Sequence, residues 1–360
     1  MSEFPQPTRR DNRRKSTRIS KLLIILISIS VIIAGGAYLG KSSIRLLLDV
    51  VAGTEYNSSG IGVVSFVVNK DDNGEIVAKN LVAAGITKEF DSTLRHIYAA
   101  NPTFFPGTYL IPKQINTDEA IRILTDPTHL VVDKVTIREG LRIDSVLTLL
   151  ADATGIAKQD FVTASKDLSS FDLPESAPSL EGYLFPATYS FDPALSAKQI
   201  LSVMVTRTKE QLVDDGVSKK DWHKVLTLAS VIQMEARQTQ DFYKVSRVFT
   251  NRLAIGMHLQ SDATVSYGVN GSTVSTSNAD RNDANRYNTY RYAGLPVGPI
   301  SGAGATAIDA ALHPVDGSWL FFCAVNLKTG ETVFSTTVAE HEKAVAQWRK
   351  WMLENPGWNG

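Results

Sequence analysis

One glutamate stands where the apolar face of a predicted helix would continue. The helix is indicated by the stretch LTLASVIQMEARQ, and its buried face would consist of Val225, Leu228, Ala229 and Ile232. Position 235 is next on that face, so the Glu235 carboxylate would point toward the interior or the floor of a cleft. Burial raises the pKa of a carboxylate and makes it a proton donor near neutral pH. The same pattern also fits a boundary glutamate that reaches solvent past the last turn.

The elements that would position Glu235 follow from local signals. Its helix would begin at Ser218, because Ser218 and Asp221 form the S-x-x-D pattern of a capping box. A second helix is predicted from about Phe242 to Leu253, followed by a region rich in Asn, Ser, Thr, Tyr and Gly. The remaining predicted elements are a helix near 304–312, strands in WLFFCAV and TVFS, and a C-terminal helix from about Val338.

The sequence predicts an α+β fold with a small module, residues 62–127, before a mixed α+β domain, residues 128–360. The module's predicted elements are strands 63–68 and 107–112, a helix 75–85, a helix with Phe90, Leu94, Ile97 and Tyr98 on one face, and a helix 117–124 capped by Asn116 or Thr117. The larger domain would open with a strand within 129–140, a helix at about 144–153, an irregular segment 166–180 and a helix at about 196–215.

The N-terminal region predicts a membrane anchor. Residues 1–21 hold seven Lys or Arg against Glu3 and Asp11, and residues 22–40 carry no charge over 19 positions. Such a length spans a bilayer as a helix, and the preceding basic tail would remain in the cytoplasm. Residues 41–61 would form a linker. We therefore expect a single-pass cell-membrane protein with an extracytoplasmic C-terminal part, and a cleaved signal peptide is the competing interpretation.

Six motifs occur in an order that resembles one enzyme family. They are LASVIQMEA, VFTNRL, LQSDATVSYG, YNTY, GLPVGPI and FSTTVAEH. Over about residues 60–350 the chain resembles the endolytic murein transglycosylases, the MltG or YceG-like family. The resemblance implies a membrane anchor, a LysM-like module and a domain that cleaves peptidoglycan glycan strands.

The family's catalytic motif reads approximately A-S-I-V-E-K-E-A, and here it is Ala229–Ala236. The first glutamate of the pattern is replaced by Gln233 and the lysine by Met234, whereas Glu235 matches the family's catalytic acid. Within this helix one carboxylate remains for the chemistry. The segment FPATY also departs from the family's FPDTY at Ala187, and Glu342 stands where an asparagine is frequent.

The resemblance also suggests which residues hold the sugar. Amides and hydroxyls suit N-acetyl and hydroxyl groups, and tyrosines offer apolar ring faces. The residues of the matching motifs, together with a histidine that could orient the substrate, are Asn251, Gln260, Ser261, Asp262, Thr264, Tyr287, Asn288, Thr289, Tyr290 and His341. Hydrogen bonding that stabilises loops is the alternative role for each of them.

The implied reaction explains why one carboxylate can suffice. In a lytic transglycosylase the C6 hydroxyl of N-acetylmuramic acid attacks its own C1, so no water acts as nucleophile and a 1,6-anhydro ring forms. Glu235 would first protonate the departing oxygen and then accept the hydroxyl proton. The first alternative is a muramidase that uses Glu235 and Asp262 with water. The second is an anchored glycan-binding scaffold without activity, which Gln233 and Ala187 favour slightly.

Composition limits the other functions. The formal net charge is zero, which gives no basic signature of nucleic-acid binding. The six histidines form no H-x-x-x-H pair and no phosphate-binding loop is present, so we expect neither a metal nor a cofactor. Cys323 lies in an apolar run and is predicted to be a structural thiol. The expected partners are peptidoglycan strands, membrane lipid at residues 22–40 and, from the resemblance, penicillin-binding synthases.

Overall fold

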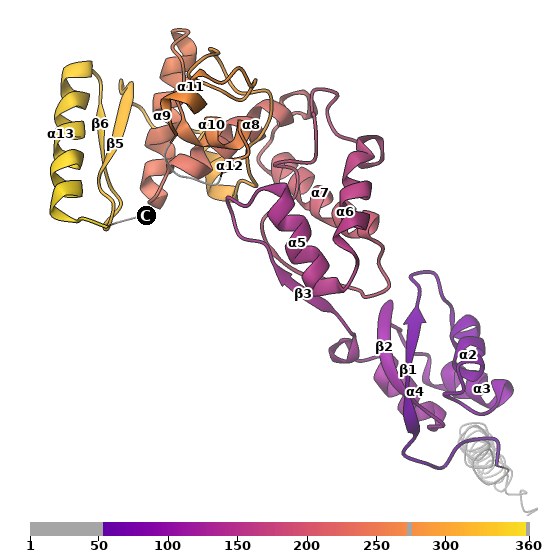
Figure 1. The fold of residues 1–360 in the computed structure, drawn as a ribbon. Coiled ribbons are helices and arrows are strands. Elements are labelled where there is room, and N and C mark those ends of the chain that lie inside the picture. Colours follow the sequence, from indigo (N-terminus) through magenta and orange to yellow (C-terminus); the bar gives the residue numbers. More distant parts are fainter. Residues whose placement is uncertain (1–52, 272–275, 358–360) are drawn as a thin grey trace, which may run out of the picture. The chain divides into compact units, whose positions relative to one another are not determined.

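The computed structural model describes residues 53–271 and 276–357, and it is a mixed α+β fold (Figure 1). The chain divides into two compact units, Met1–Val131 and Val132–Gly360. Within the described part, every helix is too short or too polar to cross a membrane. The predicted basic tail and membrane helix, residues 1–40, lie outside the described residues.

The first unit is built on one antiparallel pair of strands. Phe66 on β1 pairs with Tyr109 on β2, and both side chains point into the core. The elements of this unit are β1 (Ile61–Val68), α2 (Gly74–Ala83), α3 (Phe90–Ala100), β2 (Gly107–Lys113), α4 (Thr117–Leu124) and a 3-10 turn (Pro127–His129). Helix α4 has the predicted bounds, and the Asn116 side chain caps it by accepting a hydrogen bond from the Glu119 N–H.

Two details of the first unit differ from or extend the predictions. Tyr98 was expected on the buried face of α3, but its side chain is 63% exposed, because α3 buries Ile97 and the polar Ser92, Thr93 and His96 instead.

Glu55, in the segment before β1, is buried. Its carboxylate accepts hydrogen bonds from the Ser92 hydroxyl (2.6 Å) and the Thr117 N–H (2.8 Å), which fastens this segment to α3 and α4.

The second unit opens with a short hairpin followed by helices. The elements are β3 (Asp133–Thr136), α5 (Ile143–Thr154), α6 (Lys158–Lys166), a 3-10 turn (Leu168–Phe171), β4 (Thr188–Phe191) and α7 (Ala197–Asp214). β3 pairs antiparallel with β4. The predicted strand within 129–140 forms only at β3, because Pro127 starts a 3-10 turn capped by Asp126 and that turn extends to His129.

The middle of the second unit carries the helix that ends at Glu235. The elements are a 3-10 turn (Lys219–Asp221), α8 (Trp222–Glu235), α9 (Thr239–Ala254), α10 (Asp262–Gly268), α11 (Asn278–Asn282) and α12 (Ala305–Leu312). Helix α8 does not begin at Ser218 as predicted. The Ser218 hydroxyl donates to the Asp221 carboxylate (2.6 Å) rather than capping a helix, and the 3-10 turn comes first.

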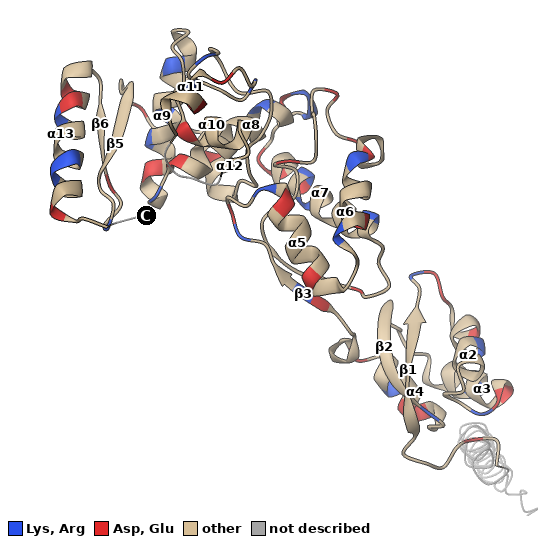
Figure 2. Ribbon diagram, in the orientation of Figure 1, with Lys and Arg blue, Asp and Glu red and all other residues tan. Residues whose placement is uncertain are grey.

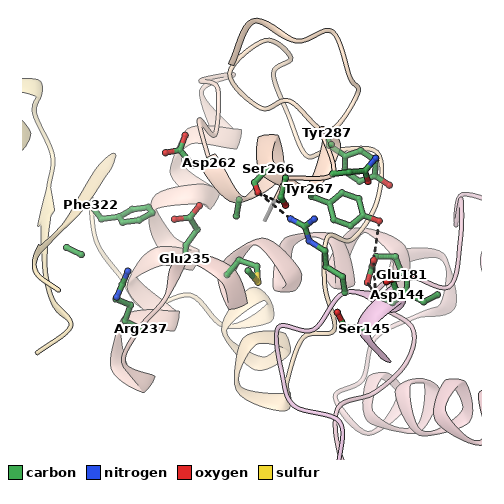
Figure 3. A pocket seen from close by; sticks show the side chains of 18 of the residues that line it. Asp144, Ser145, Glu181, Glu235, Arg237, Asp262, Ser266, Tyr267, Tyr287 and Phe322 are labelled. Carbon is green, nitrogen blue, oxygen red and sulfur yellow. Dashed lines mark hydrogen bonds between the residues drawn. The ribbon is translucent and has the colours of Figure 1, made fainter. Parts of the chain in front are cut away.

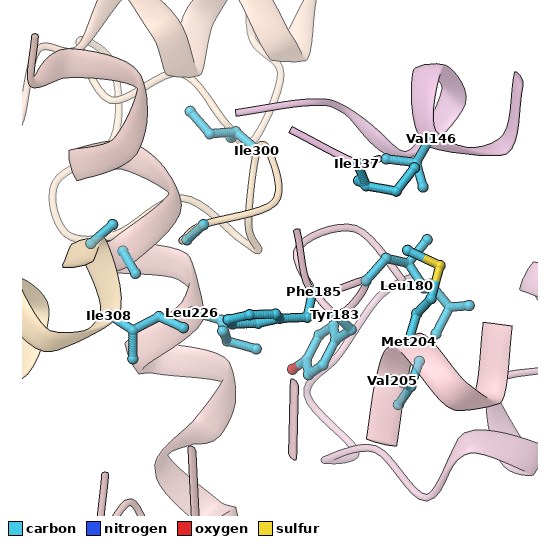
Figure 4. Packing of buried hydrophobic residues seen from close by; sticks show 14 of the residues in the cluster. Ile137, Val146, Leu180, Tyr183, Phe185, Met204, Val205, Leu226, Ile300 and Ile308 are labelled. Atoms are coloured by element: carbon cyan, nitrogen blue, oxygen red, sulfur yellow. The ribbon is translucent and has the colours of Figure 1, made fainter. Parts of the chain in front are cut away.

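The core of this unit lies between α8 and the segment that leads into α7. Figure 4 shows the Phe185 ring between Leu226 on α8 and the Tyr183 side chain, with Met204 and Val205 of α7 beyond it. The predicted α8 face is largely confirmed, since Leu228, Ala229 and Ile232 are buried and Val225 is half-buried. Helix α8 is therefore held firmly up to its last turn.

The C-terminal part is a hairpin covered by a helix. Its elements are β5 (Phe321–Asn326), β6 (Glu331–Ser335) and α13 (Val338–Glu354). Phe322 on β5 packs edge-on against Phe249 of α9, with ring centroids 5.8 Å apart, which joins the hairpin to the central helices. Charges of both signs alternate along α13, whereas β5 and β6 are mostly uncharged (Figure 2).

Candidate active site

Glu235 is the last residue of α8 and lies at a cavity of about 1030 Å³. The backbone leaves the helix at Ala236, which is extended (ψ 133°), so the glutamate is placed where the buried helix reaches the cavity. The side chain is partly exposed, as a proton donor to a bound substrate must be. Glu235 thus lies at a cleft, as predicted. The alternative, a boundary glutamate, correctly describes its position at the end of the helix.

Several groups act on the pKa of Glu235, and the net result is a raised pKa. Burial is the largest cause, and the negative charge of Asp262 adds to it. Hydrogen bonds from the Ser261 hydroxyl and the Ala263 N–H oppose the rise, because both stabilise the carboxylate. The Ser261 hydroxyl donates to Oε1 of Glu235 at 2.5 Å. Glu235 is therefore suited to donate a proton and then to be stabilised as an anion.

Buried threonines hold Ser261 in place. The Ser261 N–H donates to the Thr289 hydroxyl (3.0 Å), and the Thr264 hydroxyl donates to the Ser261 carbonyl (2.7 Å). The two threonine hydroxyls also lie 2.8 Å apart. Thr264 and Thr289, which the sequence suggested as sugar ligands, are buried and do not line the cavity. In the structure they position the serine that contacts Glu235.

Asp262 lines the cavity, but both of its oxygens are engaged. Oδ1 accepts hydrogen bonds from the Thr276 hydroxyl (2.6 Å) and the Tyr290 hydroxyl (2.9 Å). The Arg281 guanidinium donates to both oxygens, at 3.2 and 3.1 Å. This network connects Thr276, in the loop after α10, to Asp262 at the start of α10. A carboxylate held in this way is poorly placed to attack a sugar carbon.

The other predicted binding residues are distributed unevenly. Tyr287 lines the cavity and packs on Tyr267, with ring centroids 4.7 Å apart. Asn288 is buried, and its side-chain amide donates to three backbone carbonyls of the 280–283 segment. Four more predicted binding residues do not line the cavity, and each contacts either a backbone group or another side chain. They are Asn251, Gln260, Tyr290 and His341.

Glu181 is a second cavity carboxylate, for which the sequence predicted no role. It is only 2% exposed and accepts hydrogen bonds from the Ile143 N–H (3.1 Å) and the Tyr267 hydroxyl (3.2 Å). Burial raises the pKa of Glu181 to about 7. Because it lies in an irregular segment, no periodic pattern marks it. The available signal was a glutamate next to a glycine within an aromatic-rich stretch.

The two carboxylates lie toward different ends of the cavity. Figure 3 shows Glu235 with Arg237 and Phe322 at one end, and Glu181 with Tyr267 and Tyr287 at the other. The cavity wall also includes Cys323 on β5, a half-buried thiol whose pKa is raised by burial. Among the described residues, no three His, Cys, Asp or Glu side chains gather as a metal site would require.

The residues that depart from the family pattern have structural contacts here. Oε1 of Gln233 accepts a hydrogen bond from the Gly304 N–H (3.0 Å), at the start of α12. An amide serves this purpose as well as a carboxylate does. The Ala187 carbonyl accepts from the Ile137 N–H (2.9 Å) next to the β3–β4 pair, and Glu342 is exposed on α13. None of these three residues lines the cavity, whereas Met234, which replaces the family's lysine, does.

Comparison with known proteins gives the family. The model of the YceG-like family matches residues 66–347, which is most of the chain. This protein belongs to the YceG-like family. An endolytic murein transglycosylase of Bacillus subtilis (strain 168) is 32% identical over 342 residues, covering 87% of this chain and 90% of the relative. One from Streptococcus pneumoniae (serotype 2, strain D39) is 25% identical over 369 residues and is covered to 66% of its length.

A solved structure agrees with this assignment. The crystal structure of a putative YceG-like protein from Listeria monocytogenes matches with a TM-score of 0.52 and 29% identity. The match covers 78% of this chain and 98% of the other. Helix α8 and the cavity beside it therefore belong to a YceG-like fold.

Proposed function

We propose that the protein is an endolytic lytic transglycosylase of peptidoglycan, with Glu235 as its catalytic acid and base. The observation that carries the proposal is the carboxylate at the end of α8, which lies at the cavity, has its pKa raised by burial and accepts a hydrogen bond from the Ser261 hydroxyl. It stands at the position of the family's catalytic glutamate. The names of the relatives from Bacillus subtilis and Streptococcus pneumoniae support the same activity.

The proposed reaction has two proton transfers in sequence. Protonated Glu235 donates its proton to the glycosidic oxygen that leaves C1 of N-acetylmuramic acid. The C6 hydroxyl of that sugar then forms the new bond to C1, and the Glu235 carboxylate takes its proton. The Ser261 hydroxyl and the Ala263 N–H stabilise the intervening carboxylate. No water enters, so the product is a 1,6-anhydro end and the enzyme returns to its protonated state.

The muramidase alternative fits the structure less well. It would need Asp262 as a nucleophile or as a base for water, and Asp262 is bound by Arg281, Thr276 and Tyr290. Digestion in oxygen-18 water followed by mass spectrometry separates the two reactions. A lytic transglycosylase yields unlabelled anhydro ends, whereas labelled reducing ends would contradict our proposal.

The substitution Glu235→Gln tests the catalytic residue. We expect at least a hundredfold loss of glycan cleavage, because an amide cannot donate the proton and general acid–base catalysis contributes about 10²–10⁴-fold. The fold should be retained, since Gln keeps the shape and can accept the Ser261 hydrogen bond. Cleavage of uncross-linked glycan by purified residues 42–360 is the measurement. Equal turnover by the variant and the wild type would contradict a catalytic role for Glu235.

The remaining parts of the proposal concern location and partners. We propose a single-pass anchor at residues 22–40, which would place the enzyme where new strands emerge and let it end their elongation. A two-stranded sheet with helices in the first unit is compatible with a LysM-like glycan-binding module at residues 62–127. A penicillin-binding synthase is the partner that such a location favours. Fractionation of membranes from cells expressing the chain with and without residues 1–40 tests the anchor.

A further inference from the structure

Acidic side chains outnumber basic ones in the cavity lining, but most of the acidic ones are paired or have raised pKa values. Two are basic and four acidic: Arg142, Arg237, Asp144, Glu181, Glu235 and Asp262. Asp144 is paired with Lys158 (2.7 Å), and Asp262 is paired with Arg281 (3.1 Å). Glu181 and Glu235 have raised pKa values because both are buried. Two of the four carboxylates are therefore paired with cations outside the cavity lining, and burial opposes ionisation of the other two.

The two cavity arginines keep their full charge. Across residues 53–271 and 276–357, no carboxylate forms an ion pair with Arg142 or Arg237. An arginine remains protonated at any physiological pH, and a guanidinium that is not in an ion pair can still bind a carboxylate. The cavity thus offers two guanidinium groups to an anionic ligand, although its acidic residues outnumber its basic ones.

Arg142 is the better organised of the two. Its guanidinium carbon lies 5.1 Å from the centroid of the Tyr267 ring, and Nη2 lies 3.4 Å from the Ser266 hydroxyl oxygen. Tyr267 is itself held by its hydrogen bond to Glu181 (3.2 Å). Arg237 is exposed and has no comparable contacts. Because its orientation is largely fixed, Arg142 loses less conformational freedom when a ligand binds.

We propose that Arg142 binds a carboxylate carried by the muramyl residue of the substrate, and so makes the enzyme selective for acidic glycan. This inference rests on the proposed transglycosylase function. N-acetylglucosamine is neutral, whereas muramic acid carries a lactyl ether that ends in a carboxyl group. That group is either free or joined to a peptide with carboxylates of its own. A planar guanidinium recognises either kind with paired hydrogen bonds.

The test compares three substrates. They are peptide-bearing strands, peptide-free strands with free lactyl carboxylates, and peptide-free strands whose carboxylates have been converted to neutral methylamides. We expect wild-type kcat/KM to be about tenfold higher on acidic than on neutral strands, the size of one charge-assisted hydrogen bond. A preference for the first substrate over the second assigns the carboxylate to the peptide, and the reverse order assigns it to the lactyl group. Equal rates mean that Arg142 accepts either carboxylate.

The variant Arg142→Gln should erase this preference by slowing cleavage of acidic strands while leaving the neutral strands unaffected. The matched control, Arg237→Gln, should keep it. Loss of the preference in the control instead, an equal loss on all substrates in Arg142→Gln, or no preference in the wild type would overturn the inference. If wild type cleaves none of the three, the proposed function itself fails.

A salt titration of the wild type decides the question if Arg142→Gln does not fold, as checked by circular dichroism. Added salt weakens attraction between charges, so kcat/KM should fall on acidic strands and stay constant on methylamide strands. The same salt dependence on both substrates would contradict a role for the guanidinium.

Discussion

At the scale of single residues, the contact between Ser261 and Glu235 lowers a pKa that burial raises. Burial raises the pKa of Glu235, and the hydrogen bond from the Ser261 hydroxyl lowers it. Because a proton donor must be protonated in the free enzyme, the alkaline limb of kcat/KM reports this pKa. The serine is therefore one of the groups that determine how far toward alkaline pH the enzyme can work.

The substitution Ser261→Ala should move that limb. Removing the hydroxyl takes away a group that stabilises the carboxylate, so the pKa of Glu235 rises and the alkaline limb shifts to higher pH. The rate at the optimum should fall, because the carboxylate formed during the reaction loses a donor. The pH profile of kcat/KM measures both effects. A limb that stays in place, or moves to lower pH, would show that Ser261 does not act on Glu235 in this way.

Glu181 should give the protein a measurable dependence of stability on pH. Its pKa is about 7 in the folded chain against an ordinary value of 4.5, so the folded state holds the proton more tightly. The stability it contributes is complete below about pH 4.5 and is lost as pH rises through 7. From pH 5 to pH 8 the loss is on the order of 2 kcal/mol.

The variant Glu181→Gln should reduce that loss. Glutamine can still accept the Ile143 N–H and the Tyr267 hydroxyl, but it binds no proton. The free energy of unfolding, measured with urea at pH 5 and pH 8, should then differ less than in the wild type. Some slope should remain, because Glu235 also has a raised pKa. An unchanged slope would mean that Glu181 does not titrate in this range.

Sequence patterns identified Glu235 because its position is encoded by helix periodicity. The same patterns missed Glu181, whose burial depends on contacts with α5 and α10 that lie 38 and 86 residues away in sequence. They also could not separate sugar ligands from supporting residues. A threonine that holds a loop and a threonine that holds a sugar have the same side chain, and only the fold shows that Thr264 and Thr289 face inward.

At the scale of elements, the turn that contains Glu181 depends on the glycine that follows it. Gly182 has φ +79°, and a Cβ atom there would lie 2.3 Å from Cβ of Pro299. Gly182→Ala should destabilise the fold by about 2–4 kcal/mol, combining left-handed strain with overpacking. Urea unfolding provides the measurement.

Gly155, the C-cap of α5, is the matched control for that substitution. It has a similar φ of +72° and nothing within 4 Å of an added Cβ. Gly155→Ala should therefore cost only the conformational strain, about 1 kcal/mol. Equal losses in the two variants would show that the approach of Pro299 does not matter.

The elements that sequence predicted best have strong local signals. Helix α4 has a capping asparagine and a clear apolar face, and its bounds agree with the prediction. Helix α10 was not predicted, because it is seven residues long and mostly polar. Strand β4 was also missed, since its pairing with β3 joins residues more than 50 positions apart. These two elements are specified by the tertiary structure, and α10 is the one that places Ser261.

At the scale of the whole molecule, the two units have separate cores. One core runs from Phe66 to Leu124 and the other from Val135 to Ala310. All residues that line the cavity belong to the second unit. Residues 132–360 should therefore fold alone and retain glycan cleavage in solution. Circular dichroism and a cleavage assay on this fragment test the expectation, and a folded but inactive fragment would show that the first unit is needed for catalysis.

The position of Cys323 allows ligand binding in the cavity to be followed by chemical labelling of a natural residue. It is the chain's single cysteine, and it lines the same cavity as Glu235. A thiol-reactive dye added to the unmodified protein can therefore attach at one place only. Its attachment should speed up in alkaline buffer, because the reactive species is the thiolate. Oligosaccharides that occupy the cavity should shield the sulfur, so the rate of dye attachment would measure ligand affinity without any engineered residue.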